Sequence, residues 1–311
     1  MDEKKIRRVS PGMKKAESET ATADAPLKIA RYRTTTLGDL GARLPVGIPS
    51  GQKFERTIGV REFTLAEEKE IGGFRAKAKG LTAGRLVSEV LSVTCTQLGP
   101  HDFEKMKKSE RLVALAKMQM MDVLYTYFWV RVESLGTEFP IGITCPGCRS
   151  TFRFSTDLND LDVKVIDYGD GEEDTLVDQT FEHILDEPIT FGKETGTALT
   201  IGPIEWAAMD TPALEGIHAF NPAIRDMVML KGAIKELDGK PIIVTLQDLE
   251  RARMRVKTKN ELMAAVQESM AGPQLFIEAD CEKCARSLMQ TIEWSYDVFF
   301  GLSSPSESGE K

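Results

Sequence analysis

The chain has 311 residues, of which 41% are hydrophobic and 28% charged, as is usual for a globular protein. Its formal net charge of −8 argues against broad binding to a phosphate backbone, which requires a basic surface. No apolar segment follows the basic N-terminal residues, and no apolar run approaches the ~20 residues of a membrane-spanning helix, so we expect a soluble protein.

Both ends of the chain are predicted to be flexible. Residues 1–40 are mostly polar, rich in Ala, Thr and Glu, and show no periodic apolar face, so they cannot bury enough surface to order alone. Their basic cluster (Lys4, Lys5, Arg7 and Arg8) leaves open an arm that orders on a partner. Residues 303–311 have a similar composition and predict a second short tail.

Residues 41–156 predict a helical region. Ile58, Val60 and Phe63 suggest a short strand, and Thr64 with Glu67 forms a capping box that should start a helix. A second helix is predicted over 82–97, with Cys95 in it as a buried small apolar residue. The third, over 103–134, is apolar nearly all round, which suits either a core helix or a helix in a subunit interface.

Residues 157–272 predict a mixed β/α insertion. Short β segments around 162–169, 180–191 and 197–206 are followed by three helical segments, at 222–237, 245–253 and 258–270. Asp238-Gly239 predicts a turn, and Thr245 with Asp248 predicts a helix start. Residues 273–302 then return to β structure, so the whole chain is predicted to be α+β.

Four of the five cysteines form two C-x-x-C pairs, Cys145-Pro-Gly-Cys148 and Cys281-Glu-Lys-Cys284. Each pair lies between two β-like segments, and the tight C-x-x-C turn lets two thiolates reach one ion. Four thiolates favour a structural zinc ion with no open coordination position. The sequence therefore predicts one Zn²⁺ held by these four cysteines in a zinc ribbon that the insertion splits, which loop-closure entropy tolerates.

Other readings of these residues remain open. The pairs could instead be reducible dithiols, as in thioredoxin-like proteins, or could bind another metal. His101, His183 and His218 do not fall in a ligand pattern. No nucleophile elbow, H-E-x-x-H motif, phosphate loop or dinucleotide fingerprint is found, so we expect a protein that is not an enzyme.

The order of these features resembles the baseplate-hub and tail-assembly proteins of contractile-tailed phages and related injection systems. The resemblance rests on Leu44-Pro45 and Ser50-Gly51, the Arg61-Glu-Phe-Thr64 turn into a Glu-rich helix, the two cysteine pairs, and the aromatic end Phe299-Phe300. It implies a structural or assembly component of a baseplate, with other tail proteins as partners and the zinc ribbon as a rigid brace. It also implies location in the host cytoplasm during assembly, or in the virion tail, and an oligomer within a symmetric assembly.

A nucleic-acid-binding zinc-ribbon regulator is the alternative. Arg149, Arg153, Lys283 and Arg286 lie near the cysteine pairs, and Phe152 and Phe154 would offer stacking faces unless they face the core.

Overall fold

The computed structural model describes residues 28–78, 80–168, 174–215, 221–252 and 254–300. It contains both helices and strands, which confirms the α+β class. The described residues divide into two compact units, a larger one of residues 28–178, 204–228 and 270–300 and a smaller one of 179–203 and 229–269. The segment 157–272, expected from the sequence as an insertion, contributes to both units, with residues 157–178, 204–228 and 270–272 in the larger one. No helix in the described residues is both long and apolar enough to cross a bilayer.

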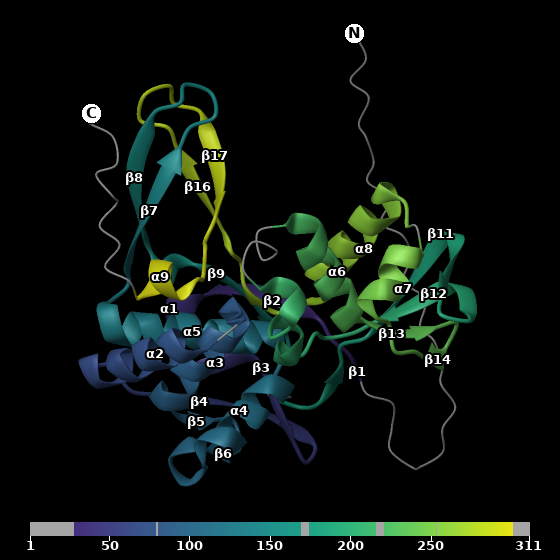
Figure 1. Cartoon of the computed structure of the whole chain (residues 1–311), viewed down its shortest axis with the longest axis horizontal. Helices are drawn as coiled ribbons and strands as arrows, with labels where there is room; N and C mark the ends of the chain where they lie inside the picture. The colour runs from purple at the N-terminus through teal and green to yellow at the C-terminus, as the bar shows by residue number, and fades with distance from the viewer. Residues whose placement is uncertain (1–27, 79, 169–173, 216–220, 253, 301–311) are drawn as a thin grey trace. The chain divides into compact units, whose positions relative to one another are not determined.

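The larger unit is built on helix α5 (Met120–Leu135), which is surrounded by other elements of the same unit (Figure 1). Its other helices are α1 (Leu37–Leu40), α2 (Leu65–Lys77), α3 (Ala83–Thr94), α4 (Lys108–Lys117) and α9 (Tyr296–Phe299). Short 3₁₀ turns are η1 (Phe103–Lys105), η2 (Leu158–Asp160), η3 (Trp206–Met209) and η4 (Pro212–Leu214). Tyr125, Tyr127 and Phe128 of α5 are fully buried, so the core interpretation of this helix is confirmed.

The strands of the larger unit form small sheets. Their bounds are β1 (Lys28–Ile29), β2 (Tyr32–Thr36), β3 (Arg43–Ser50), β4 (Lys53–Val60), β5 (Cys95–Leu98), β6 (His101–Asp102), β7 (Glu138–Thr144), β8 (Thr151–Asp157), β9 (Asp162–Ile166), β10 (Val177–Asp178), β15 (Gly272–Pro273), β16 (Phe276–Asp280) and β17 (Ser287–Thr291). The sheet orders are β3-β4-β5-β6, β15-β9-β2, β1-β10, β7-β8 and β16-β17.

The smaller unit has a four-stranded sheet in the order β11-β12-β13-β14. These strands are β11 (Phe181–Phe191), β12 (Glu194–Ile201), β13 (Ile234–Leu237) and β14 (Lys240–Pro241). Helices α7 (Leu246–Arg251) and α8 (Val256–Ser269) contact β11, and the boundary with the larger unit falls within α6 (Pro222–Ala233). Leu262 and Val266, four residues apart on one face of α8, are both buried.

The local signals read from the sequence are present. Thr64 caps α2 and Thr245 caps α7, each in a reciprocal capping box with the residue three positions on. Asp238 and Gly239 both have positive φ, at 49° and 74°, in the tight turn between β13 and β14.

Four expectations differ from the structure, each because of a contact with a distant segment, and the fourth, the helix over 222–237, is described in the next paragraph. Residues 28–40, assigned above to the flexible tail, include β2, which pairs antiparallel with β9; residues 1–27 lie outside the described part. Cys95 is buried as expected, but it begins β5 instead of lying in the helix. The long helix predicted over 103–134 is broken into η1, α4 and α5.

The break between α4 and α5 has a clear cause. The N–H of Met120 donates to the Ile204 carbonyl at 2.8 Å, and the N–H of Trp206 donates to the Met118 carbonyl at 2.8 Å. Gln119 therefore forms a β-bridge with Glu205 in place of helical hydrogen bonds. The predicted helix over 222–237 likewise ends at Ala233, because Ile234–Leu237 joins the sheet as β13.

Candidate metal centre

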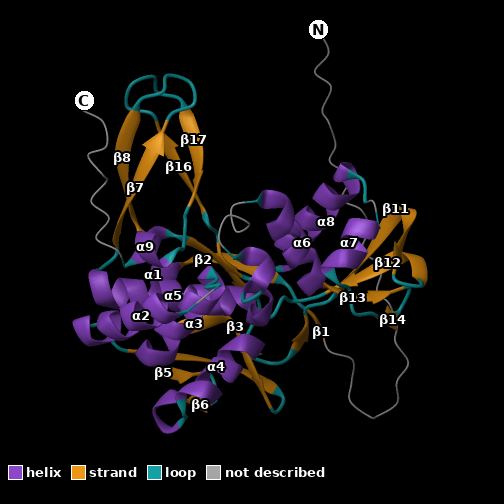
Figure 2. Ribbon diagram, viewed as in Figure 1, coloured by secondary structure: helices purple, strands orange, loops and turns teal. Residues whose placement is uncertain are grey.

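The two C-x-x-C pairs lie in the loops of two antiparallel hairpins, β7-β8 and β16-β17. Each hairpin therefore has the strand, knuckle, strand order expected from the sequence. The two hairpins lie side by side with their loops at the same end, away from α5 and α9 of the same unit (Figure 2). Six buried side chains join them: Ile143, Cys145, Phe152, Ala279, Cys281 and Leu288.

The backbone has the same conformation in both loops. In the first, the N–H of Cys145 donates to the Ser150 carbonyl at 2.9 Å, and the N–H of Arg149 donates to the Cys145 carbonyl at 2.8 Å. The second loop repeats these bonds with Cys281, Arg286 and Ala285 at 2.9 and 2.8 Å. The residue after the second cysteine has positive φ in both, 59° at Arg149 and 53° at Ala285. The left-handed turn is therefore a requirement of the loop, although neither residue is glycine.

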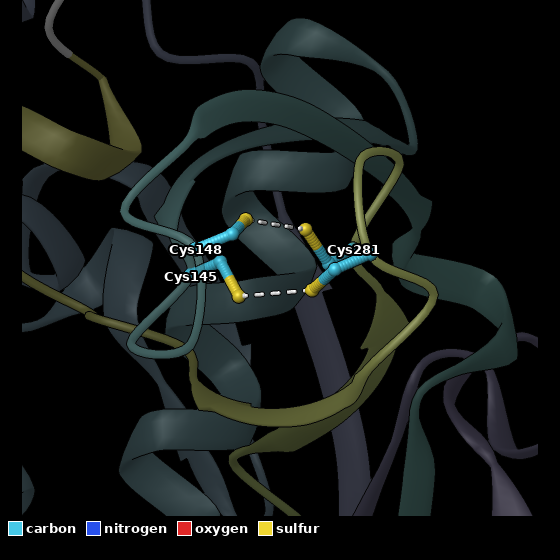
Figure 3. Close-up of side chains that lie close together, drawn as sticks. Cys145, Cys148 and Cys281 are labelled. Atoms are coloured by element: carbon cyan, nitrogen blue, oxygen red, sulfur yellow. Dashed lines mark hydrogen bonds between the residues drawn. The ribbon is translucent and has the colours of Figure 1, made fainter.

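The four Sγ atoms converge on one point, and all lie within 4.8 Å of one another. Two contacts join the hairpins: Sγ of Cys148 lies 3.6 Å from Sγ of Cys281 (Figure 3), and Sγ of Cys145 lies 3.7 Å from Sγ of Cys284. A tetrahedron with Zn–S bonds of about 2.3 Å has sulfur–sulfur edges of about 3.8 Å, whereas a disulfide needs about 2.05 Å. All four cysteines are free, so the arrangement is compatible with one structural zinc ion.

The hydroxyl of Ser150 is a contact that the sequence analysis missed. Its Oγ lies 2.9 Å from Cys148 Sγ and 3.4 Å from Cys281 Sγ, so it links the two pairs. A hydroxyl beside two metal-binding sulfurs donates to thiolates and fixes their orientation, as outer-shell groups in metal sites do. The only sequence signal was its position two residues after the second cysteine.

Hydrogen bonds shift the thiol pKa values within the cluster. The pKa of Cys281 is lowered to about 6, chiefly because the Ser150 hydroxyl donates to its sulfur, with help from the backbone N–H groups of Cys284 and Lys283. For Cys284, the N–H of Arg286 lowers the pKa, but contacts with the other thiols and burial outweigh it, and the pKa rises to about 11. Four crowded thiols cannot all ionise beside one another without a cation, so the site favours a divalent ion over free thiolates.

Charged groups around the loops partly follow the expectation. The Arg286 guanidinium lies across Gly147 of the other loop, since a Cβ built on Gly147 would stand 3.3 Å from its Nη1. Arg286 therefore lies where its charge could offset the negative charge of four thiolates, and the side chains of Arg286, Arg149 and Lys283 are all exposed.

The aromatic residues near the cysteines face inward. Phe152 is 9% exposed within the cluster that joins the hairpins, and Phe154 packs against that cluster. Phe152 is therefore not available to stack on a base, and Phe154 is partly covered, which weakens the support of these two rings for the nucleic-acid alternative.

The base of the first hairpin is fixed to α5. The guanidinium of Arg131 donates to the carbonyls of Gly136 at 2.6 Å and Glu138 at 3.1 Å, and lies over the ring of Phe139. Phe139 is 2% exposed and its ring centroid is 5.3 Å from that of Phe299. These contacts couple the hairpin to the core of the larger unit.

A second constellation that the sequence did not reveal lies where β3 meets α5. The buried carboxylate of Asp122 accepts hydrogen bonds from the N–H groups of Val46 at 3.0 Å and Gly47 at 2.9 Å. From the other side, Arg56 Nε donates to the Leu44 carbonyl at 2.6 Å. Burial raises the pKa of Asp122 to about 6, while the bonds from Val46 and Gly47 and the charge of Arg56 oppose that rise. This clamp fixes the irregular segment at Leu44–Gly47, where the β3-β4 register shifts.

Of the three histidines, His101 lies in β6 and His183 in β11, while His218 lies outside the described residues. Among the described residues, the four cysteines are the cluster of His, Cys, Asp or Glu side chains that the geometry brings together for a metal.

Comparison with known proteins finds one family that matches part of this chain. Residues 43–197 match the family described as "T4 bacteriophage base plate protein". The match contains the Asp122 clamp, β7, β8 and the first cysteine pair, and it ends before the second pair. No curated protein and no solved structure matches the chain. The family match supports a phage baseplate protein, a structural component of the phage tail.

Proposed function

We propose that this protein is a non-enzymatic structural or assembly component of a contractile-tail baseplate, or of a related injection machine. Cys145, Cys148, Cys281 and Cys284 hold one structural Zn²⁺, and the ribbon braces a surface that contacts other tail proteins. The observation that carries the proposal is the convergence of four sulfurs from two distant hairpins in a chain whose residues 43–197 match a baseplate family. Partners are other tail proteins, met during assembly in the host cytoplasm or in the finished tail.

Zinc, when bound, supplies four bonds that cross-link the two loops. The chain supplies everything else that makes the ribbon rigid. Ile143, Phe152 and Leu288 fill the space between the hairpins, and Arg131 with Phe139 joins the base of the first hairpin to α5. A rigid support of this kind holds a protein-binding surface in one geometry, which lowers the entropy that association costs.

The test combines metal analysis with assembly. The purified chain should contain one zinc per molecule by native mass spectrometry, and Cys281→Ser should lose it. When the same variant replaces the wild-type chain in its own phage or injection system, the yield of complete particles should fall. Cys95→Ala is the matched control, because Cys95 is a buried free cysteine far from the cluster in sequence. A metal-free wild-type chain would refute the zinc assignment, and normal particles without the chain would refute the baseplate role.

A further inference from the structure

The outward surface of the second hairpin has a composition that the ribbon fold does not require. Cross-strand pairing places Phe276 opposite Thr291, Glu278 opposite Met289, and Asp280 opposite Ser287. Directly opposed residues share one face of a two-stranded sheet, and all six side chains are exposed. We call these six residues the outer ribbon face.

Two large apolar side chains stand in solvent on this face. Phe276 is 52% exposed and Met289 is 71% exposed. The alternate residues of the same strands, Ala279 and Leu288, are buried against the first hairpin, so the sheet already has its apolar inner side. Phe276 and Met289 therefore lie outside the buried cluster that joins the two hairpins. Aromatic residues and methionine are the types enriched in the centres of protein interfaces.

The first hairpin provides an internal comparison. Its loop repeats the backbone geometry of the second, but its outward residues include no exposed large apolar side chain. The pairs there are Glu138–Asp157, Pro140–Ser155, Gly142–Arg153 and Thr144–Thr151. The apolar outward residues thus belong to one hairpin only, which is typical of a binding surface and not of a folding requirement.

The charges on the outer ribbon face limit what can cover it. Glu278 and Asp280 are exposed, and neither forms an ion pair within the described part of the chain. They lie two positions apart on one strand, which is a spacing of about 6.6 Å. Nucleic acid and anionic lipid are repelled by such a pair. A second copy meeting this face across a two-fold axis would bring carboxylates against carboxylates.

From this complementarity we infer that the outer ribbon face binds a segment of a different protein in which apolar side chains alternate with Lys or Arg. The apolar residues cover Phe276 and Met289, and two basic residues reach Glu278 and Asp280. Charge pairing of this kind selects the partner and its register, while the buried aromatic and methionine supply contact area. The inference rests on the proposed function, because it names the ribbon surface that the zinc would hold rigid.

The experiment is site-specific photo-cross-linking during particle assembly. A benzophenone amino acid replaces Met289 in the full-length chain, with a second probe at Ser155, on the outward side of the first hairpin. Zinc content of each probe variant establishes that the ribbon is intact. We expect the Met289 probe to label one other tail protein, within a few residues of at least two Lys or Arg, and the Ser155 probe not to label that segment.

Charge reversal then tests the pairing. Glu278→Lys with Asp280→Lys should lower the Met289 cross-link at least tenfold, and replacing the partner's two basic residues by Glu should restore it. Glu62→Lys with Glu133→Lys changes the net charge equally at exposed sites and should leave the yield unchanged.

Four outcomes would overturn the inference: labelling of nucleic acid, labelling of a second copy, a Met289 yield that both charge reversals leave unchanged, or no labelling by the Met289 probe. If the Ser155 probe labels a tail protein while the Met289 probe labels none, the outer ribbon face is not the binding surface and the baseplate role stands. If neither probe labels anything and particles form without the chain, the proposed function fails as well.

Discussion

Replacing Cys281 by Ser should unfold the ribbon while the rest of the larger unit stays folded. Cys281 is 2% exposed and stands 3.6 Å from Cys148, so the substitution removes one of four convergent sulfurs. Isolated two-stranded sheets are marginally stable, and the ribbon consists of two of them. Its large core side chains are Ile143, Phe152 and Leu288, each worth about 1.5–3 kcal/mol of burial as an upper estimate. A structural zinc contributes about 10–16 kcal/mol in small zinc-finger peptides, so the proposed zinc would contribute more to the stability of the ribbon than these side chains do.

Amide hydrogen exchange followed by mass spectrometry measures the unfolding of the ribbon separately from that of the rest of the chain. We expect peptides covering β7-β8 and β16-β17 to exchange at least 100-fold faster in the variant, equivalent to about 3 kcal/mol. Peptides from α5 should change little, because this helix also packs against α3, β3 and β15, which lie outside the ribbon. A strong chelator should reproduce the effect in the wild-type chain. Ser150→Ala should weaken zinc binding 10–100-fold without this unfolding at saturating zinc, since its hydroxyl only orients the sulfurs.

Unchanged protection of both hairpins in the zinc-free protein would show that side-chain packing alone holds the ribbon, against this prediction. Loss of protection throughout α5 would also contradict it, since the ribbon would then be part of one cooperative unit with the core. Cys95→Ala, which removes a thiol outside the cluster, should keep one zinc per chain and normal exchange in both hairpins.

Three further substitutions test local claims. Ala285→Gly should raise the free energy of unfolding of the zinc-loaded ribbon by about 1 kcal/mol, because it relieves a φ of 53° at a residue with a Cβ. A lower melting temperature of the variant would contradict this prediction. Glu67→Gln should destabilise the protein at pH 7, because the pKa of Glu67 is lowered to about 2, chiefly by the hydrogen bond from the Thr64 hydroxyl. A lowered pKa gives stability that is present above the unfolded value of about 4.5 and lost toward pH 2, so the difference between variant and wild type in urea denaturation should shrink over that range. Gly47→Ala should cost about 3 kcal/mol in the same assay, because φ is +106° and the new Cβ would stand 2.6 Å from Arg56 Cγ; a loss below 1 kcal/mol would show that β3 relaxes.

The features that the sequence predicted correctly depend on residues close together in the chain. A capping box needs only Thr64 and Glu67, and a cysteine loop needs only four residues and the turn between them. The α+β class follows from such local signals, because each helix and strand carries its own periodicity. The convergence of the two cysteine pairs was predicted from the preference of zinc for four ligands, and the structure brings the four sulfurs together.

The features that the sequence did not reveal depend on contacts between distant residues. The strand β2 is polar and reads as part of a tail, but its register with β9 joins Tyr32 to Ile166. The break at Gln119 depends on Glu205, and the clamp at Gly47 depends on a carboxylate in α5. No periodicity within one segment can report such a partner, so these features required the structure.

The pairing of β9 with β15 explains how the ribbon tolerates its long interruption. β9 follows the first hairpin, β15 precedes the second, and Pro273 pairs with Val163 and Gly272 with Lys164 in one antiparallel sheet. Gly272 fits closely against α5, because a Cβ there would stand 2.3 Å from that of Met121. The sheet therefore brings the two hairpins together at their base. The pairing of β9 with β15 offsets most of the entropic cost of closing the long segment between the hairpins, so little of that cost falls on the metal site. On the proposed function, a zinc ion would hold only the loops of the two hairpins together, so its removal should free the hairpins and leave the sheet that anchors them.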